Sequence, residues 1–287
     1  MVELVLQLIA NGLSTGVGYA IVALSLTLVF GVLHVINFAH GEVFMVGALT
    51  ALVATRAGVP YLATLLLAVA AGIAVGAIVD VVCVRSLLER QGDHTEVLLS
   101  TFAASILVHE AVLFGWGSQP ADVAGIPGLL HVGPVVLPWH RLFILAAGVA
   151  VLLGFEGLLR RTRFGVEMRA VAQSGFAARL VGIRLRRVRS LTFVLSAAIG
   201  ALAGALLAPA IFFSPSMGHA VLIKAFVVVV MGGLGSVRGA VVFGLLLGVC
   251  EALVAAFASE AIAAAALYGL MLLVLLWRPH GLLGKPT

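Results

Sequence analysis

Long apolar runs separated by short polar segments cover almost the whole chain. Nine runs can be delimited, and several reach the roughly 20 apolar residues that a helix needs to cross a bilayer. They lie at residues 5–33, 40–57, 61–84, 96–116, 141–159, 190–213, 219–236, 240–258 and 261–277. The alternating segments of about ten residues that are typical of a membrane β-barrel do not occur in the sequence. The pattern therefore predicts an all-α, polytopic integral membrane protein with about eight or nine transmembrane helices.

Two interruptions of this pattern predict broken helices near the centre of the fold. The first, HVINFAHGEV at 34–43, contributes Asn37, His40, Gly41 and Glu42. The second, MGGLGSVRGA at 231–240, is too short for an ordinary loop and contributes Gly232, Gly233 and Gly235. The first stretch fits two interpretations: a polar turn at the membrane interface, or a break whose side chains line a pathway or bond freed backbone groups.

Composition favours a membrane protein over a soluble one. The mean hydropathy is +1.22 and only 10% of the residues are charged, whereas soluble domains average about 25%. The cysteines, Cys83 and Cys250, lie in apolar runs and are interpreted as packing residues. The net charge of +5 does not indicate nucleic-acid binding, because basic residues in a membrane protein mainly report its topology. We expect a single transmembrane domain over residues 1–287.

The distribution of arginine predicts which loops are cytoplasmic. Residues 160–189 hold nine of the 17 basic residues and one acid, Glu167, so this loop is expected inside the cell. Arg85 and Arg90 place the loop at 85–95 on the same side, and Arg278 and Lys285 place the C-terminus there. Residues 117–140 carry no Lys or Arg and contain four prolines, so this loop is expected outside. Nine crossings then put the N-terminus outside.

The sequence contains no motif for ATP binding and none for a catalytic zinc site. It lacks the G-x-x-x-x-G-K-[ST] loop that cradles ATP phosphates and the H-E-x-x-H metal site. We therefore predict no enzyme, no catalytic residue and no metal site. Ionisable residues inside the runs are scattered: Glu251 fits either a buried polar contact or a role in a pathway, and Lys224 is able to extend toward the membrane surface.

The arginine-rich segment has an amphipathic pattern. Apolar side chains recur at three- to four-residue intervals from Phe164 to Phe176, which predicts a short helix. Gly175 interrupts that pattern, and Gly182 is placed to end a second helix. Either a helix pair that lies on anionic lipid or a docking element for a cytoplasmic partner fits these features.

Five stretches in order carry a resemblance to a known family. They are VINFAHGEVFMVGA, RFGVEMRAVAQSGFAARLVGI, LTFVLSAAIGALAGALLAP, IKAFVVVVMGGLGSVRGA and LLVLLWRPHGLLG. Together they closely resemble the membrane permeases of branched-chain amino acid ABC importers, from about Asn11 to Gly284. The chain departs from the family pattern at Arg238, where a proline is usual, and at Ser259-Glu260, where the family often has a longer polar connection.

The resemblance implies a multi-subunit importer in the bacterial inner (plasma) membrane. Its parts are a second homologous permease, two cytoplasmic ATP-binding subunits and an extracytoplasmic substrate-binding protein, so the chain itself needs no cofactor. Residues 160–189 then form the cytoplasmic coupling segment that docks on an ATPase, and both breaks lie beside the translocation path, for which Glu251 is a further candidate on its position in an apolar run. The coupling residues carried over from the resemblance are Phe164, Gly165, Met168, Arg169, Ala172, Gly175, Phe176, Ala178, Leu180 and Gly182.

The activity implied by the resemblance is inward movement of leucine, isoleucine or valine by alternating access, driven by ATP hydrolysis in the partner subunits. Two alternatives remain at this level. The same machine could carry urea, a short amide or another amino acid, because related permeases share these motifs. A stand-alone channel or facilitator is less favoured, since it gives the amphipathic cytoplasmic segment no task.

Overall fold

The computed structural model describes residues 2–89, 94–132, 135–278 and 281–283. Its helices are α1 (Val2–Leu33), α2 (His40–Arg56), α3 (Tyr61–Val79), the π-helical turn η1 (Asp80–Arg85), α4 (Ser86–Glu89), α5 (His94–Trp116), α6 (Trp139–Arg161), α7 (Arg163–Gln173), α8 (Gly175–Leu180), α9 (Leu185–Ile211), α10 (Met217–Gly232), α11 (Val237–Phe257) and α12 (Glu260–Trp277). An antiparallel hairpin of β1 (Leu129–Val132) and β2 (Val135–Pro138) precedes α6. The prediction of an all-α, polytopic membrane protein is confirmed.

Seven helices of the described chain are long and apolar enough to cross a membrane. The apolar runs at 40–57 and 219–236 differ from the prediction of full crossings. They form α2 and α10, with 17 and 16 residues. At 1.5 Å per residue these helices are about 25 Å long, short of the roughly 30 Å hydrocarbon core. We refer to α2 and α10 as the half-helices.

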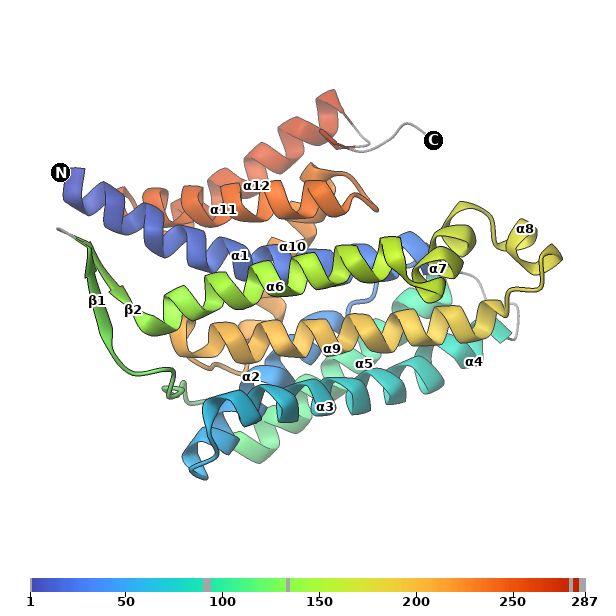
Figure 1. Ribbon diagram of the computed structural model, residues 1–287, viewed down its shortest axis with the longest axis horizontal. Coiled ribbons are helices and arrows are strands. Elements are labelled where there is room, and N and C mark those ends of the chain that lie inside the picture. Colours follow the sequence, from blue (N-terminus) through green and yellow to red (C-terminus); the bar gives the residue numbers. More distant parts are fainter. Residues whose placement is uncertain (1, 90–93, 133–134, 279–280, 284–287) are drawn as a thin grey trace.

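The two half-helices belong to two structurally similar halves of opposite direction. Helix α1 ends at Leu33 and is followed by His34 at φ 57°, while α9 ends at Ile211 and is followed by Phe212 at φ 62°. These are the only non-glycine residues with positive φ in the part of the chain that the structure describes. In each half a short extended link then leads into a half-helix. Helices α1 and α9 run in opposite directions (Figure 1), which is the arrangement of an inverted repeat.

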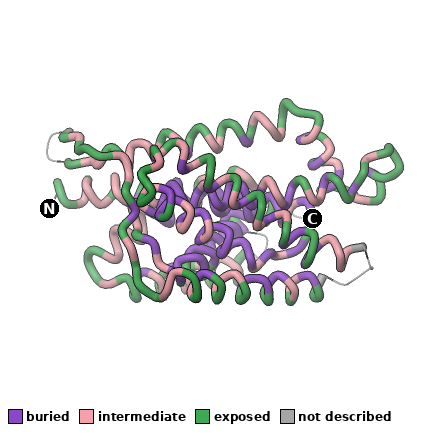
Figure 2. Tube along the Cα trace, turned by 90° about the horizontal axis from the view of Figure 1, so that it is seen from below, coloured by how far each residue is buried: buried purple, intermediate pink, exposed green. Residues whose placement is uncertain are grey.

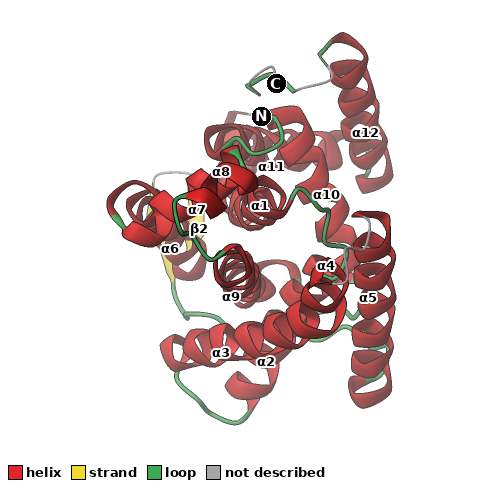
Figure 3. Cartoon of the chain, turned by 90° about the vertical axis from the view of Figure 1, so that its right-hand side faces the viewer, coloured by secondary structure: helices red, strands yellow, loops and turns green. Residues whose placement is uncertain are grey.

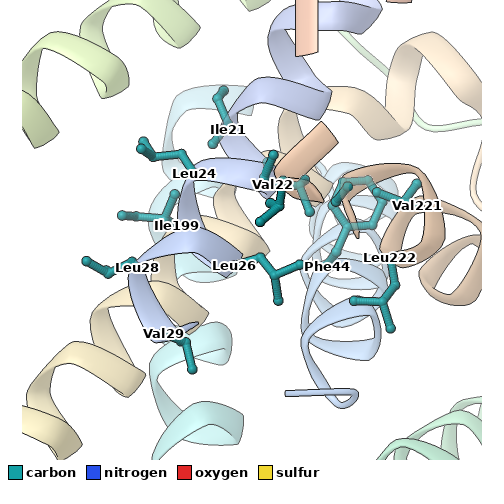
Figure 4. Close-up of a cluster of buried hydrophobic side chains, with 14 of the residues drawn as sticks. Ile21, Val22, Leu24, Leu26, Leu28, Val29, Phe44, Ile199, Val221 and Leu222 are labelled. Carbon is teal, nitrogen blue, oxygen red and sulfur yellow. The ribbon is translucent and has the colours of Figure 1, made fainter. Parts of the chain in front are cut away.

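The core lies at the centre of the helix assembly, around α1, α2, α9 and α10. Buried residues gather there in Figure 2, whereas α5, α6 and α12 expose most of their length. Side chains of α1, α2, α9 and α10 interdigitate in this core (Figure 4), for example Val22, Phe44 and Leu222. Small residues bring the backbones close: a Cβ added at Gly16 would lie 2.9 Å from the carbonyl oxygen of Gly244.

The polar segments gather at the two ends of the assembly. The β1–β2 hairpin lies at the end where α1 begins, and α4, α7 and α8 lie at the opposite end, which Figure 3 shows from outside. The arginine-rich segment and Arg85 therefore share one end, as the topology prediction requires. Arg90 and Lys285, used in the same prediction, lie outside the described residues.

Candidate functional site

The break between α1 and α2 is built from residues that satisfy the freed backbone. Because His34 adopts a left-handed conformation, α1 stops and the chain turns back into the membrane. Asn37 is buried, and its Oδ1 accepts a hydrogen bond from the Ala39 N–H at 3.0 Å. Thr101 Oγ1, on α5, accepts one from the Phe38 N–H at 3.4 Å. Asn37 is thus a buried residue that stabilises the start of α2.

His40 joins three helices in the core. Its side chain is almost completely buried, and its Nε2 lies 2.6 Å from Ser25 Oγ on α1. Ser25 Oγ in turn donates to the Val22 carbonyl at 2.7 Å, so the imidazole N–H is the donor to Ser25. On the other side the ring packs on Gly200 of α9, where an added Cβ would lie 3.0 Å from the ring. This enclosure gives His40 a packing role that fixes where α2 begins.

Gly41 brings the first turns of the two half-helices together. A Cβ added at Gly41 would lie 2.4 Å from the carbonyl oxygen of Gly218, and one added at Gly218 would lie 2.7 Å from the carbonyl oxygen of Gly41. A side chain at either position would overlap backbone. The N-termini of α2 and α10 therefore meet, and the positive ends of both helix dipoles point to one place.

Glu42 occupies this meeting point with three side chains from α5 and α10. Its side chain is 1% exposed, and Oε1 lies 3.5 Å from both Ser105 Oγ and His219 Nδ1. Its Oε2 lies 3.9 Å from His109 Nδ1. We call Glu42, Ser105, His109 and His219 the central polar cluster. The carboxylate sits in the first turn of α2 and beside that of α10, where both dipoles stabilise its negative charge.

The central polar cluster is unsatisfied and open on one side. Glu42 Oε2 and His109 Nδ1 are buried atoms without a hydrogen-bond partner among the described residues. The side chains of His109 and His219 are 30% and 53% exposed, so the cluster reaches the surface through them. A buried polar atom without a partner costs stability unless something else bonds it. The arrangement can accept a cationic group at the carboxylate.

Three of these four residues were not singled out from the sequence. Ser105, His109 and His219 belong to none of the motifs or polar interruptions that the sequence shows. One signal was available: each half-helix begins with a glycine followed by an ionisable residue, Gly41-Glu42 in α2 and Gly218-His219 in α10.

The second glycine-rich break lies away from the central polar cluster. Gly233 and Gly235 adopt positive φ angles of 96° and 84°, and they turn the chain from α10 into α11. Ser236 Oγ accepts from the Gly239 N–H at 3.1 Å and caps α11. Gly232 packs on Gly239, backbone to backbone. All of α10 separates this turn from Glu42, so the structure does not bring Gly232, Gly233 and Gly235 to the same site.

Glu251 belongs to a separate ion pair in the membrane. Lys224 Nζ of α10 donates to Glu251 Oε1 of α11 and, at 3.1 Å, to the Tyr19 hydroxyl of α1. Lys224 does not use its freedom to extend outward, because its ammonium group is bonded to Glu251 and Tyr19 and its side chain is only 22% exposed. Of the two interpretations of Glu251, the structure favours a buried polar contact that joins helices.

The arginine-rich segment forms two short helices, as its pattern predicted. Thr162 Oγ1 caps α7 and Ser174 Oγ caps α8, so the interruption comes from Ser174, and Gly175 is the first residue of α8. Gly182, at φ 85°, follows α8.

The coupling residues divide into an inner and an outer group. Gly165, Met168 and Ala178 are buried against the protein and cannot reach a partner. Phe176 and Leu180 are each 74% exposed, and the neighbouring Val181 is 75% exposed. These three form what we call the α8 apolar patch. Of the others, Phe164 and Ala172 are partly buried, Gly175 lies at the α7–α8 junction, and Arg169 donates to the Leu159 carbonyl.

Comparison with known proteins places the chain in a family. Residues 8–276 match the family model described as branched-chain amino acid transport system / permease component. The chain is 36% identical to the high-affinity branched-chain amino acid transport system permease protein BraD of Pseudomonas aeruginosa, over 98% of this chain and 96% of BraD. It is 35% identical to LivH of Escherichia coli K12, a permease protein of the same description, with the same coverage.

More distant similarities agree with this placement. LivM of Escherichia coli K12, another high-affinity branched-chain amino acid permease protein, is 33% identical over 50% of this chain and 34% of its own length. Among solved structures, PsaBC from Streptococcus pneumoniae in complex with Fab has a TM-score of 0.53 at 10% identity, covering 92% of this chain and 89% of that chain, which shows a shared fold. On its sequence, this chain belongs to the permease-component family of branched-chain amino acid transport systems.

Proposed function

We propose that this chain is the membrane-spanning permease subunit of an ABC importer that moves leucine, isoleucine and valine inward by alternating access. The observation that carries the proposal is the buried Glu42 carboxylate at the meeting point of two half-helix N-termini. Family membership supplies the substrate class, since the relatives are permeases for branched-chain amino acids.

The central polar cluster suits a transient site for a zwitterion. The Glu42 carboxylate would attract the α-ammonium group, and the N–H groups of the half-helices would attract the α-carboxylate. Apolar residues extend from the cluster along the same helix faces. Phe102 and Ile106 precede His109 on α5, and Ile223 lies one turn after His219 on α10; they are 42%, 47% and 44% exposed. They offer a branched aliphatic side chain an apolar surface.

The partners of this importer belong to the same proposal. The open side of the central polar cluster would face a second, homologous permease, which would complete the path. The α8 apolar patch would dock on one of two cytoplasmic ATPase subunits that hydrolyse ATP, and a substrate-binding protein would deliver the amino acid outside. The positive-inside rule then places the α7–α8 end in the cytoplasm and the N-terminus outside, in a bacterial plasma membrane.

Competition between cargoes tests the proposed substrate class. Uptake of labelled leucine into vesicles that contain the assembled importer should be inhibited by isoleucine and valine. Urea and a short amide such as acetamide should not compete at the same concentration. Inhibition by urea or acetamide, with no effect of isoleucine and valine, would contradict the proposed cargo.

A further inference from the structure

A basic groove lies at the cytoplasmic end of the described chain, apart from the central polar cluster. It has a volume of about 790 Å³ and runs between η1–α4 on one wall and the α8–α9 junction on the other. Figure 3 looks onto this end, where α8, α9 and α4 are all seen. Six arginines line the groove, together with Asp80, Ser190 and five apolar side chains. The arginines are Arg85, Arg179, Arg184, Arg186, Arg187 and Arg189.

Four of the six arginines carry positive charge that the described residues do not neutralise with an ion pair. Asp80, Arg85 and Arg186 already have interaction partners. For the other four arginines, the described residues show no ion pair with a carboxylate. Arg189 is partly buried, and its Nε is a buried donor without a hydrogen-bond partner in the described chain. Like charges held together in this way favour an anion between them.

The start of α9 adds donors to the same place. Helix α9 begins at Leu185 in the groove wall, and its N-cap residue, Arg184, makes no side-chain cap hydrogen bond. The first N–H groups of this 27-residue helix therefore lack a capping acceptor from Arg184, and its dipole adds positive potential there.

Exposed apolar side chains flank the groove on two candidate membrane spans, Tyr61–Leu88 and Leu185–Ile211. Leu88, Ile183 and Leu191 are among its apolar lining residues, and Leu191 is 44% exposed. Val81 and Val82 of η1, beside the groove wall, are 51% and 63% exposed. A ligand that fits both parts has an anionic head for the arginines and hydrocarbon chains for the apolar surface.

We propose that this groove binds the headgroup of an anionic phospholipid from the cytoplasmic leaflet, with its acyl chains along η1 and α9. Basic pockets between transmembrane helices on the cytoplasmic side suit doubly charged headgroups such as that of cardiolipin. Free phosphate would bind the arginines but would leave the apolar lining of the groove without a contact. A cytoplasmic protein would not contact the exposed apolar residues that lie on the candidate membrane spans. The proposal does not depend on which substrate the permease carries.

The test measures the thermal midpoint of the purified full-length protein in detergent with added lipid. Cardiolipin and, more weakly, phosphatidylglycerol should raise the midpoint, while phosphatidylethanolamine and inorganic phosphate at equal concentration should not. The double variant Arg184→Gln/Arg187→Gln changes two exposed groove arginines, so it should fold, and its apparent affinity for cardiolipin should fall about tenfold or more. Arg189→Gln provides a second, partly buried probe.

A matched control separates the groove from cytoplasmic charge in general. Arg161→Gln/Arg163→Gln removes two exposed arginines at the same end of the protein but outside the groove, and it should keep the full cardiolipin effect. The proposal is overturned if the control loses as much affinity as the groove variant, or if phosphate alone reproduces the shift. It is also overturned if Arg184→Gln/Arg187→Gln keeps its cardiolipin effect and loses only ATPase binding.

Discussion

Gly41 and Gly218 touch backbone to backbone at the point where the two half-helices begin. The relation is reciprocal, because a Cβ on either residue would overlap the carbonyl oxygen of the other. The two residues occupy matching places in oppositely directed halves of the chain, one position before Glu42 and His219. The contact therefore sets the distance between the two side chains at the centre of the proposed path.

Valine at Gly218 should separate the half-helices and abolish uptake. The overlap with the Gly41 carbonyl cannot be relieved by a rotamer change, so we expect a loss of about 1–3 kcal/mol in stability, typical of overpacking. Thermal denaturation in detergent and vesicle uptake measure the two effects. Gly154→Val in α6 is the control, because a Cβ there meets nothing within 4 Å. Wild-type uptake by Gly218→Val would show that the close contact is dispensable.

Removing the charge of Glu42 should impair transport more than folding. Glu42→Gln keeps the size of the side chain but loses the attraction for an ammonium group, so uptake should fall about 10- to 100-fold, as for loss of a hydrogen bond to a charged group. Glu110→Gln is the matched control, since this acid is exposed on α5 beside His109. Equal uptake rates for the Glu42 variant and wild type would remove Glu42 from the path.

The Lys224–Glu251 pair predicts a non-additive pattern of stability. Lys224→Met leaves the Glu251 carboxylate without its partner, and we expect a loss of about 3 kcal/mol. The double variant Lys224→Met/Glu251→Leu removes both charges, so it should be more stable than the single variant. Thermal midpoints of the two single variants and the double variant give the coupling. Strictly additive losses would mean that the two side chains do not depend on each other.

Phe176 should determine docking of the ATPase. An aspartate at this exposed position places a charge in the α8 apolar patch, so ATPase co-purification should be lost while the permease still inserts. Gly175→Pro is the control, and it should keep the ATPase. The amphipathic pattern alone would make it disruptive, but Gly175 is the first residue of α8, where proline is tolerated. ATPase retention by Phe176→Asp would place the docking surface elsewhere.

The sequence predicted the helices well and their arrangement less well. Run length and polarity indicated the membrane helices and the break at 34–43, because they are local properties of the chain. They could not show that the N-termini of α2 and α10 meet, since a hydropathy pattern does not say how two helices are placed relative to each other. Glu42 and His219 are 177 residues apart, and only the packing of Gly41 on Gly218 brings them together.

Burial also separated residues that looked alike in the sequence. Asn37 and His40 share the polar stretch with Glu42, yet one caps the break and the other bonds Ser25 in the core. Glu251 and Lys224 are both ionisable residues inside apolar runs of the sequence. Only the packing of α10 on α11 shows that they form an ion pair. The sequence thus indicated the helix break at 34–43, and the tertiary contacts show that Glu42 has a buried side-chain oxygen without a hydrogen-bond partner among the described residues.

The most direct test of the importer is uptake of labelled leucine in vesicles, with the second permease, the ATPase subunits and the binding protein added back one at a time. The proposed function predicts ATP-dependent leucine uptake only when all of the components are present. Leucine uptake by this chain alone, without ATP or partners, would contradict it and identify a channel or facilitator.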